Sequence, residues 1–136
     1  MRVLIVDDSM VIRRVVESAL LKADLGVEEA VTAADGAEGL EVLEQAEAAG
    51  RPIDLVLSDV HMPGMDGLEF LQERQRRGVA QGVPVLMVTA DLGDPQVVAA
   101  LDAGAQGYLA KPFTVGEIRE RVSRVWEGSF ERELVG

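Results

Sequence analysis

Apolar residues gather in short runs that are separated by longer segments of mixed polarity. The runs lie between polar or glycine-containing turns and occupy residues 3–6, 27–33, 53–57, 83–88 and 107–110. Runs of this length with these boundaries are typical of β-strands. The second run contains Glu28 and Glu29, and the fifth is short and contains Tyr108, whereas the other three are almost wholly apolar. We therefore expect five strands, of which the second and the fifth are the least buried.

The segments between these runs have the spacing of amphipathic helices. In the first, apolar residues at i, i+3 and i+4 define one face that we expect to be buried, and Ser9 or Asp8 can cap its start. The members of this face are Ile12, Val15, Val16, Ala19, Leu20 and Ala23. Asp94 and Pro95 predict the start of a later helix, and Gly104 predicts its end.

The C-terminal part of the chain predicts one more helix. Thr114 and Glu117 have the spacing of a capping box at its start. We interpret residues 1–127 as a single domain, because the 136 residues of the chain are an ordinary size for one domain. Residues 128–136 are polar and have no clear partner face, so we expect a short polar tail or the stub of a linker.

Strands that alternate with helices, and that are apolar almost throughout, favour a parallel sheet covered by helices on both faces. The predicted fold class is therefore α/β. The two least buried strands suit the edges of a five-stranded sheet in the flavodoxin-like order 2-1-3-4-5, which is a doubly wound (βα)5 sandwich.

Composition narrows the classes of function. The net charge of -11 repels a phosphate backbone, so we expect no direct binding of nucleic acid. No apolar run approaches the length of a membrane span, so we expect no membrane insertion. The chain contains no cysteine, which excludes disulfides and thiolate metal sites and favours a cytoplasmic location.

Polar residues follow directly after the predicted strands. Asp7 and Asp8 follow the first, Asp59 follows the third, Thr89 the fourth and Lys111 the fifth. The carboxyl ends of parallel strands lie along one edge of the sheet, where ligands bind in this class of fold. We therefore expect these five side chains to share one site.

Three neighbouring carboxylates repel one another unless a cation shares the site. Oxygen ligands favour Mg²⁺, with Mn²⁺ as an alternative, and a zinc site is disfavoured because the chain has one histidine and no cysteine. A carboxylate beside such an ion can attack a phosphoryl group and form an aspartyl phosphate. We expect Asp59 to be the nucleophile, Asp7 and Asp8 to hold the metal, Lys111 to bind a phosphate oxygen and Thr89 to donate its hydroxyl.

Longer motifs surround these residues. They read VDDS at residues 6–9, SDVHMPGMDG at residues 58–67, VTA at residues 88–90 and YLAKPF at residues 108–113. Together they resemble the receiver domains of two-component response regulators, particularly the single-domain CheY type. The resemblance extends from about residue 2 to residue 126.

This resemblance implies a phosphorylation switch rather than an enzyme, although a receiver assists its own phosphorylation and dephosphorylation. Asp59 would accept phosphate from a sensor histidine kinase or a histidine phosphotransfer protein. Asp8, Asp59 and the main-chain carbonyl of His61 would hold magnesium, and Asp7 would act mainly through metal-bound water.

The resemblance also implies how the signal is read. Thr89 would move toward the phosphate, which the main chain of Ala90 also contacts, and Tyr108 would turn inward. These changes would remodel the face made by the fourth helix, the fifth strand and the fifth helix, which binds a downstream protein target. The bond between Lys111 and Pro112 would be cis.

We expect two residues beside the site to affect the lifetime of the phosphorylated protein. We expect the imidazole of His61 to lie at the rim of the site, where it and Asp91 tune the access of water to the phosphate.

Several functions remain open from the sequence. A motor-switch partner, as in chemotaxis, is the leading example; a phosphorelay shuttle, a phosphate sink, and the receiver portion of a longer regulator are alternatives. A haloacid-dehalogenase-like phosphohydrolase is weaker, because its motif needs an aspartate two residues after the nucleophile. Ser9 and His61 occupy that position after Asp7 and Asp59.

Overall fold

Strands and helices alternate along the described chain. The computed structural model describes the backbone of residues 1–135 and the side chains of residues 1–126. The elements in chain order are β1 (Arg2–Val6), α1 (Met10–Lys22), β2 (Glu29–Ala33), α2 (Gly36–Ala48), β3 (Leu55–Asp59), α3 (Gly67–Arg77), β4 (Val85–Thr89), α4 (Pro95–Asp102), β5 (Gly107–Ala110) and α5 (Val115–Val135).

The five strands form one sheet in the order β2-β1-β3-β4-β5, and every neighbouring pair is parallel. This confirms the predicted α/β class, the strand order and the two edge strands. The register pairs Val6 with Ser58 and Asp59 with Val88. The residues that follow β1 therefore lie beside the end of β3.

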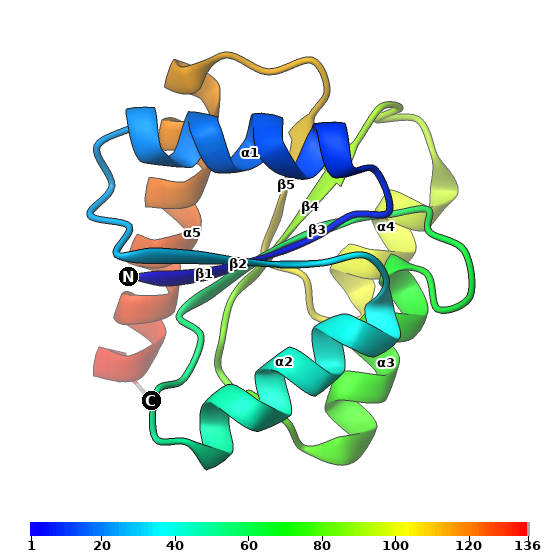
Figure 1. Cartoon of the computed structure of the whole chain (residues 1–136), viewed down its shortest axis with the longest axis vertical. Coiled ribbons are helices and arrows are strands. Elements are labelled where there is room, and N and C mark those ends of the chain that lie inside the picture. The colour runs from blue at the N-terminus through cyan, green and yellow to red at the C-terminus, as the bar shows by residue number, and fades with distance from the viewer. Residues whose placement is uncertain (136) are drawn as a thin grey trace.

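Helices cover both faces of the sheet, as Figure 1 shows: α1 and α5 lie on one face, and α2, α3 and α4 lie on the other. Alternate residues of a buried strand serve the two faces. In β1, Val3 and Ile5 pack with α1 and α5, whereas Leu4 and Val6 pack with α2 and α3. This double burial explains why the central strands are apolar throughout.

The predicted helix starts are confirmed. The hydroxyl of Ser9 accepts a hydrogen bond from the Ile12 amide at 3.2 Å, and Asp94 caps α4 with Pro95 in its first turn. The hydroxyl of Thr114 accepts a hydrogen bond from the Glu117 amide at 3.0 Å at the start of α5. Each cap satisfies an amide that has no partner within its own helix.

The prediction that Val15 belongs to the buried face of α1 was wrong, because its side chain is 49% exposed. The residues of α1 that are buried against the sheet are Val16, Ala19 and Leu20. Consecutive helical residues are rotated by about 100° around the axis, so Val15 points away when Val16 faces the sheet.

Helix α5 continues past the predicted domain boundary. Its backbone is helical to Val135 and so runs through nearly all of residues 128–136, the segment that we expect to be a polar tail or the stub of a linker. This segment contains no proline, which is the strongest helix breaker. Gly136 lies outside the described residues. Within the described part of the chain, no helix is long and apolar enough to cross a membrane.

Candidate functional site

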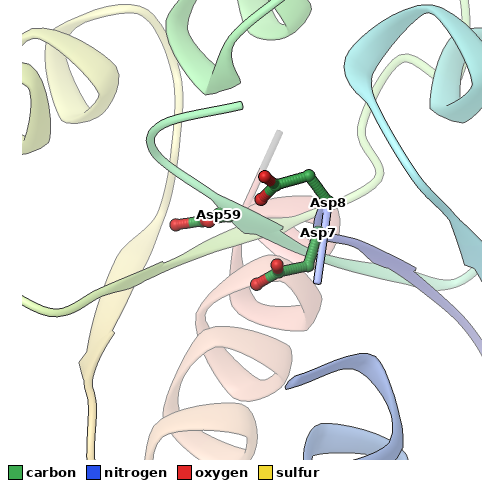
Figure 2. Close-up of side chains that lie close together, drawn as sticks. All are labelled: Asp7, Asp8 and Asp59. Atoms are coloured by element: carbon green, nitrogen blue, oxygen red, sulfur yellow. The ribbon is translucent and has the colours of Figure 1, made fainter. Parts of the chain in front are cut away.

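Three aspartates converge at the carboxyl edge of the sheet. Asp7 and Asp8 follow β1, and Asp59 is the last residue of the adjacent β3. One carboxylate oxygen from each lies within 4.8 Å of the other two. Figure 2 shows Asp7 and Asp8 together at the end of β1, with Asp59 beside them. The strand order therefore brings together residues that are about fifty positions apart in the sequence.

Asp7 is buried and is held on both sides of its carboxylate. Its Oδ1 accepts a hydrogen bond from the amide of Ser9 at 2.9 Å, and its Oδ2 lies 3.3 Å from Nζ of Lys111. Its main-chain oxygen accepts a hydrogen bond from Nη1 of Arg13 at 2.7 Å. Arg13 was not a candidate from the sequence, because only the path of the loop before α1 brings its side chain close to Asp7.

Asp59 carries an unfavourable charge. Burial of the carboxyl and the nearby Asp7 raise its pKa, while Lys111 and the amide of Val60 act in the opposite direction. Its Oδ1 accepts a hydrogen bond from the Val60 amide at 2.8 Å and lies 3.6 Å from Nζ of Lys111. The nearby ammonium group thus compensates only part of the charge of the three aspartates.

The donor set fits a hard divalent cation. The three side chains that could ligate a metal are all carboxylates, and Asp8 is exposed, so the cluster opens to solvent. Mg²⁺ prefers oxygen ligands and keeps several of its waters, which an open site allows. A cation here would also relieve the repulsion that raises the pKa of Asp59.

Thr89 and Lys111 approach from the neighbouring strands. Thr89 is buried, and its hydroxyl accepts a hydrogen bond from the Asp91 amide and donates one to the Asp91 carbonyl, both at 3.1 Å. This hydroxyl is thus bonded to its own loop, and Ala90 between the two residues is exposed. The peptide bond between Lys111 and Pro112 is cis, as the resemblance implied.

At the rim of the site, His61 and Asp91 have different hydrogen-bond partners. Nε2 of His61 forms a hydrogen bond with Oδ2 of Asp94, whereas Oδ1 of Asp91 accepts a hydrogen bond from the Gly93 amide at 2.9 Å. The bond to Asp94 raises the pKa of His61 and lowers the pKa of Asp94. The sequence indicated Asp94 only as a helix cap, because no local pattern links it to His61.

Tyr108 of β5 is partly buried, and the guanidinium of Arg121 in α5 lies over its ring, 4.9 Å from the centroid. A cation at this distance from an aromatic face is attracted to it. Tyr108 was a candidate from the sequence, but its partner Arg121 was not.

The loop after β3 approaches the site closely at Gly67. A Cβ at this position would overlap the main-chain oxygen of Asp59 and lie 2.8 Å from Cε of Met87. The amide of Gly67 also donates a hydrogen bond to the carbonyl of Val60 at 2.9 Å. Gly67 therefore has a packing role at the end of β3.

The domain is a doubly wound α/β fold of the flavodoxin-like class. An acidic cluster, a lysine and a threonine lie at the ends of its strands. The family model of the response regulator receiver domain matches residues 3–123, so the chain belongs to this family and is a signalling switch of the two-component type. This assignment disfavours the phosphohydrolase alternative.

Similar proteins agree with the assignment. The chain is 35% identical to chemotaxis protein CheY-3 of Vibrio cholerae, over 93% of this chain and 92% of that protein. It is 35% identical to chemotaxis protein CheY of Pseudomonas aeruginosa, over 93% and 97% of the two chains. The solved structure of Vibrio cholerae CheY4 at low pH superposes with a TM-score of 0.78 at 35% identity, covering 91% of this chain and 97% of that one.

Proposed function

We propose that Asp59 accepts a phosphoryl group from the phosphohistidine of a sensor histidine kinase or a histidine phosphotransfer protein. The single observation that supports this most is the convergence of three carboxylates within 4.8 Å beside the ammonium of Lys111. In this proposal Asp8, Asp59 and the main-chain carbonyl of His61 hold Mg²⁺ or Mn²⁺, and Asp7 acts through water bound to the ion.

The transfer is a single displacement at phosphorus. An oxygen of the Asp59 carboxylate attacks the phosphorus, the bond from phosphorus to the donor nitrogen breaks, and that nitrogen keeps the electron pair. Lys111 binds an oxygen of the transferred group as a point charge. The cation, when bound, neutralises negative charge on the phosphoryl oxygens. The group stays on the protein, which is therefore a phosphoacceptor and not an enzyme with a released product.

Phosphorylation would alter the surface through Thr89. Its hydroxyl would leave the Asp91 main chain and donate to a phosphoryl oxygen, beside the main-chain amide of Ala90. Tyr108 would then turn inward, and the face made by α4, β5 and α5 would change its affinity for a protein target. The two relatives that are named chemotaxis proteins support a role in chemotaxis. The absence of cysteine supports a cytoplasmic location.

The proposal is tested by mass spectrometry. The wild-type protein, Asp59→Asn and the control Asp102→Asn are incubated with a small phosphodonor and Mg²⁺ and then weighed intact. Asp102 is an exposed aspartate at the end of α4, so its replacement leaves the acidic cluster unchanged. We expect wild type and Asp102→Asn to gain one phosphoryl group and Asp59→Asn to gain none.

Two results would contradict the proposal. A phosphoryl group on Asp59→Asn would place the acceptor at another residue. An absence of any gain by the wild type, with several phosphodonors and with a histidine kinase, would mean that this receiver signals without phosphate.

A further inference from the structure

One hydrogen bond joins the segment that follows β3 to the segment that follows β4. It connects Nε2 of His61, two residues after Asp59, to Oδ2 of Asp94, the residue before α4. Strands β3 and β4 are neighbours in the sheet, and Asp59 pairs in register with Val88. The bond therefore spans the strand ends at which Asp59 and Thr89 lie.

Asp94 uses its two carboxylate oxygens for two different partners. Oδ1 accepts a hydrogen bond from the amide of Gln96 at 2.9 Å and caps α4, while Oδ2 bonds to His61. The Asp94 side chain is only 16% exposed, so its orientation is held by its surroundings. A partly buried carboxylate that makes two hydrogen bonds has a fixed orientation, so it can hold a neighbouring ring in place.

The His61 side chain needs such a support because it is 63% exposed. An exposed imidazole with no partner samples several rotamers, and one hydrogen bond to a fixed carboxylate restricts it to few of them. His61 lies two residues after Asp59, so its ring is attached to the loop that leaves the phosphoacceptor. The restricted ring thus stays on the β4 side of Asp59, while the exposed Asp8 leaves the β1 side open.

We propose that Asp94 is a positioning residue that holds the His61 ring at the rim of the site, where the ring restricts the approach of water to the phosphoryl group on Asp59. In hydrolysis, the oxygen of water attacks phosphorus and the bond from phosphorus to the Asp59 oxygen breaks. The Asp59 carboxylate is regenerated and inorganic phosphate leaves, and one proton of the water stays on the phosphate while the other goes to solvent. A ring held at the rim lengthens the life of the phosphorylated state. This inference rests on the proposed function of Asp59.

The pair also ties the phosphoacceptor loop to a helix of the expected output face. Because Asp94 both caps α4 and bonds to His61, a displacement of the first turn of α4 changes the position of the ring. A target that moves α4 would therefore alter the phosphoryl lifetime, because it would change the position of the His61 ring.

The test uses variants that separate the two bonds of Asp94. In Asp94→Ser the shorter side chain keeps the ability to cap α4 but cannot reach His61. It is compared with His61→Ala, with the double variant, and with Asp35→Ser. Asp35 caps α2 through the amide of Glu38 at 2.8 Å and forms no bond to His61, so it is the matched control.

Each protein is phosphorylated with a small phosphodonor and Mg²⁺, the donor is removed, and the phosphorylated fraction is followed by intact mass. We expect Asp94→Ser and His61→Ala each to shorten the half-life by about threefold to tenfold, the range spanned by one hydrogen bond of ordinary net strength. The double variant should decay no faster than the faster single variant. Asp35→Ser should keep the wild-type half-life.

Three results would overturn the inference while the proposed function stands: normal phosphorylation with an unchanged half-life in Asp94→Ser, a longer half-life in His61→Ala, or effects that multiply in the double variant. Failure of the wild type to accept phosphate would reject both proposals. Nitrogen–proton correlation spectra of the His61 ring serve as a second readout. The ring signals should change in Asp94→Ser and not in Asp35→Ser, and unchanged signals in Asp94→Ser would also overturn the inference.

Discussion

Asp59 is a carboxylate whose surroundings disfavour its charge. Burial and the nearby Asp7 raise its pKa, and Lys111 offsets only part of this effect. The same surroundings favour a bound cation or a bound phosphoryl group with its cation, because both change the charge balance of the cluster. The unfavourable charge of Asp59 therefore affects both the stability of the folded protein and its binding of a cation or a phosphoryl group.

This raised pKa predicts a pH-dependent effect of Asp59→Asn in metal-free protein. Because the folded pKa lies above the unfolded one, the stabilising contribution of Asp59 is complete below the unfolded pKa and is lost as the pH rises through the folded pKa. Near neutral pH, we expect Asp59→Asn to be more stable than wild type by roughly 1 kcal/mol, the size of many single-residue effects. Urea unfolding in the presence of a metal chelator measures the difference in free energy of unfolding between the two proteins.

The advantage of Asp59→Asn should shrink as the pH falls, since the wild-type carboxyl is then protonated. An advantage of equal size at acid and neutral pH would assign it to packing instead of charge.

Gly67 supplies a second prediction for a single residue. A methyl group there would overlap the Asp59 main chain, so we expect Gly67→Ala to destabilise the protein by about 1–3 kcal/mol, as overpacking does. The control is Gly116→Ala, because a Cβ at Gly116 would lie at an ordinary 3.7 Å from Oγ1 of Thr114. This control should be neutral or stabilising by up to about 1 kcal/mol. Thermal unfolding of both variants checks the difference, and equal stabilities would show that the strand end yields to the methyl group.

Among the elements, the helix starts depend on local signals, and most are readable from the sequence. Ser9, Asp94 and Thr114 were predicted as caps and act as caps. The buried face of α1 was less predictable, because Val15 and Val16 are equally apolar and only the position of the sheet decides which one is covered. A helix pattern therefore predicts that an element exists better than it predicts the rotation of its face.

The start of α3 has a capping box that we did not predict from the sequence. The amide of Glu69 donates to Oδ1 of Asp66 at 2.9 Å, and the amide of Asp66 donates to Oε1 of Glu69 at 3.4 Å. We expect Asp66→Ala to lower the free energy of unfolding by about 1 kcal/mol, since the Glu69 amide loses its partner. Asp66→Ser should lose much less, because serine also caps helices. Chemical unfolding measures both, and equal losses would mean that the cap contributes nothing specific.

At the scale of the whole molecule, the acidic site links metal binding to folding. A ligand that binds only the folded state stabilises it, by about 2.7 kcal/mol at one hundred times its dissociation constant. We expect Mg²⁺ to raise the unfolding midpoint of the wild type, and to raise it much less in Asp8→Asn and Asp59→Asn. Sodium chloride at equal ionic strength controls for general screening of the net charge of -11.

Equal shifts in all three proteins would mean that magnesium binds elsewhere on the acidic surface. Thermal unfolding with increasing Mg²⁺ distinguishes the two cases, since a specific site gives a midpoint that rises with concentration only while the cluster is intact.

Apart from the full strand order, which needed the precedent of the flavodoxin-like fold, the amino-acid sequence by itself determined the fold class, the two edge strands and the group of Asp7, Asp8, Asp59 and Lys111 at one edge. It could do so because these follow from local patterns combined with one topological rule, that parallel strands end on the same side of their sheet. The tertiary structure alone decided which side chains meet across loops. The pairs His61 with Asp94, Arg121 with Tyr108 and Arg13 with Asp7 depend on loop paths and rotamers, and these are set by packing of the whole core rather than by any short stretch of residues.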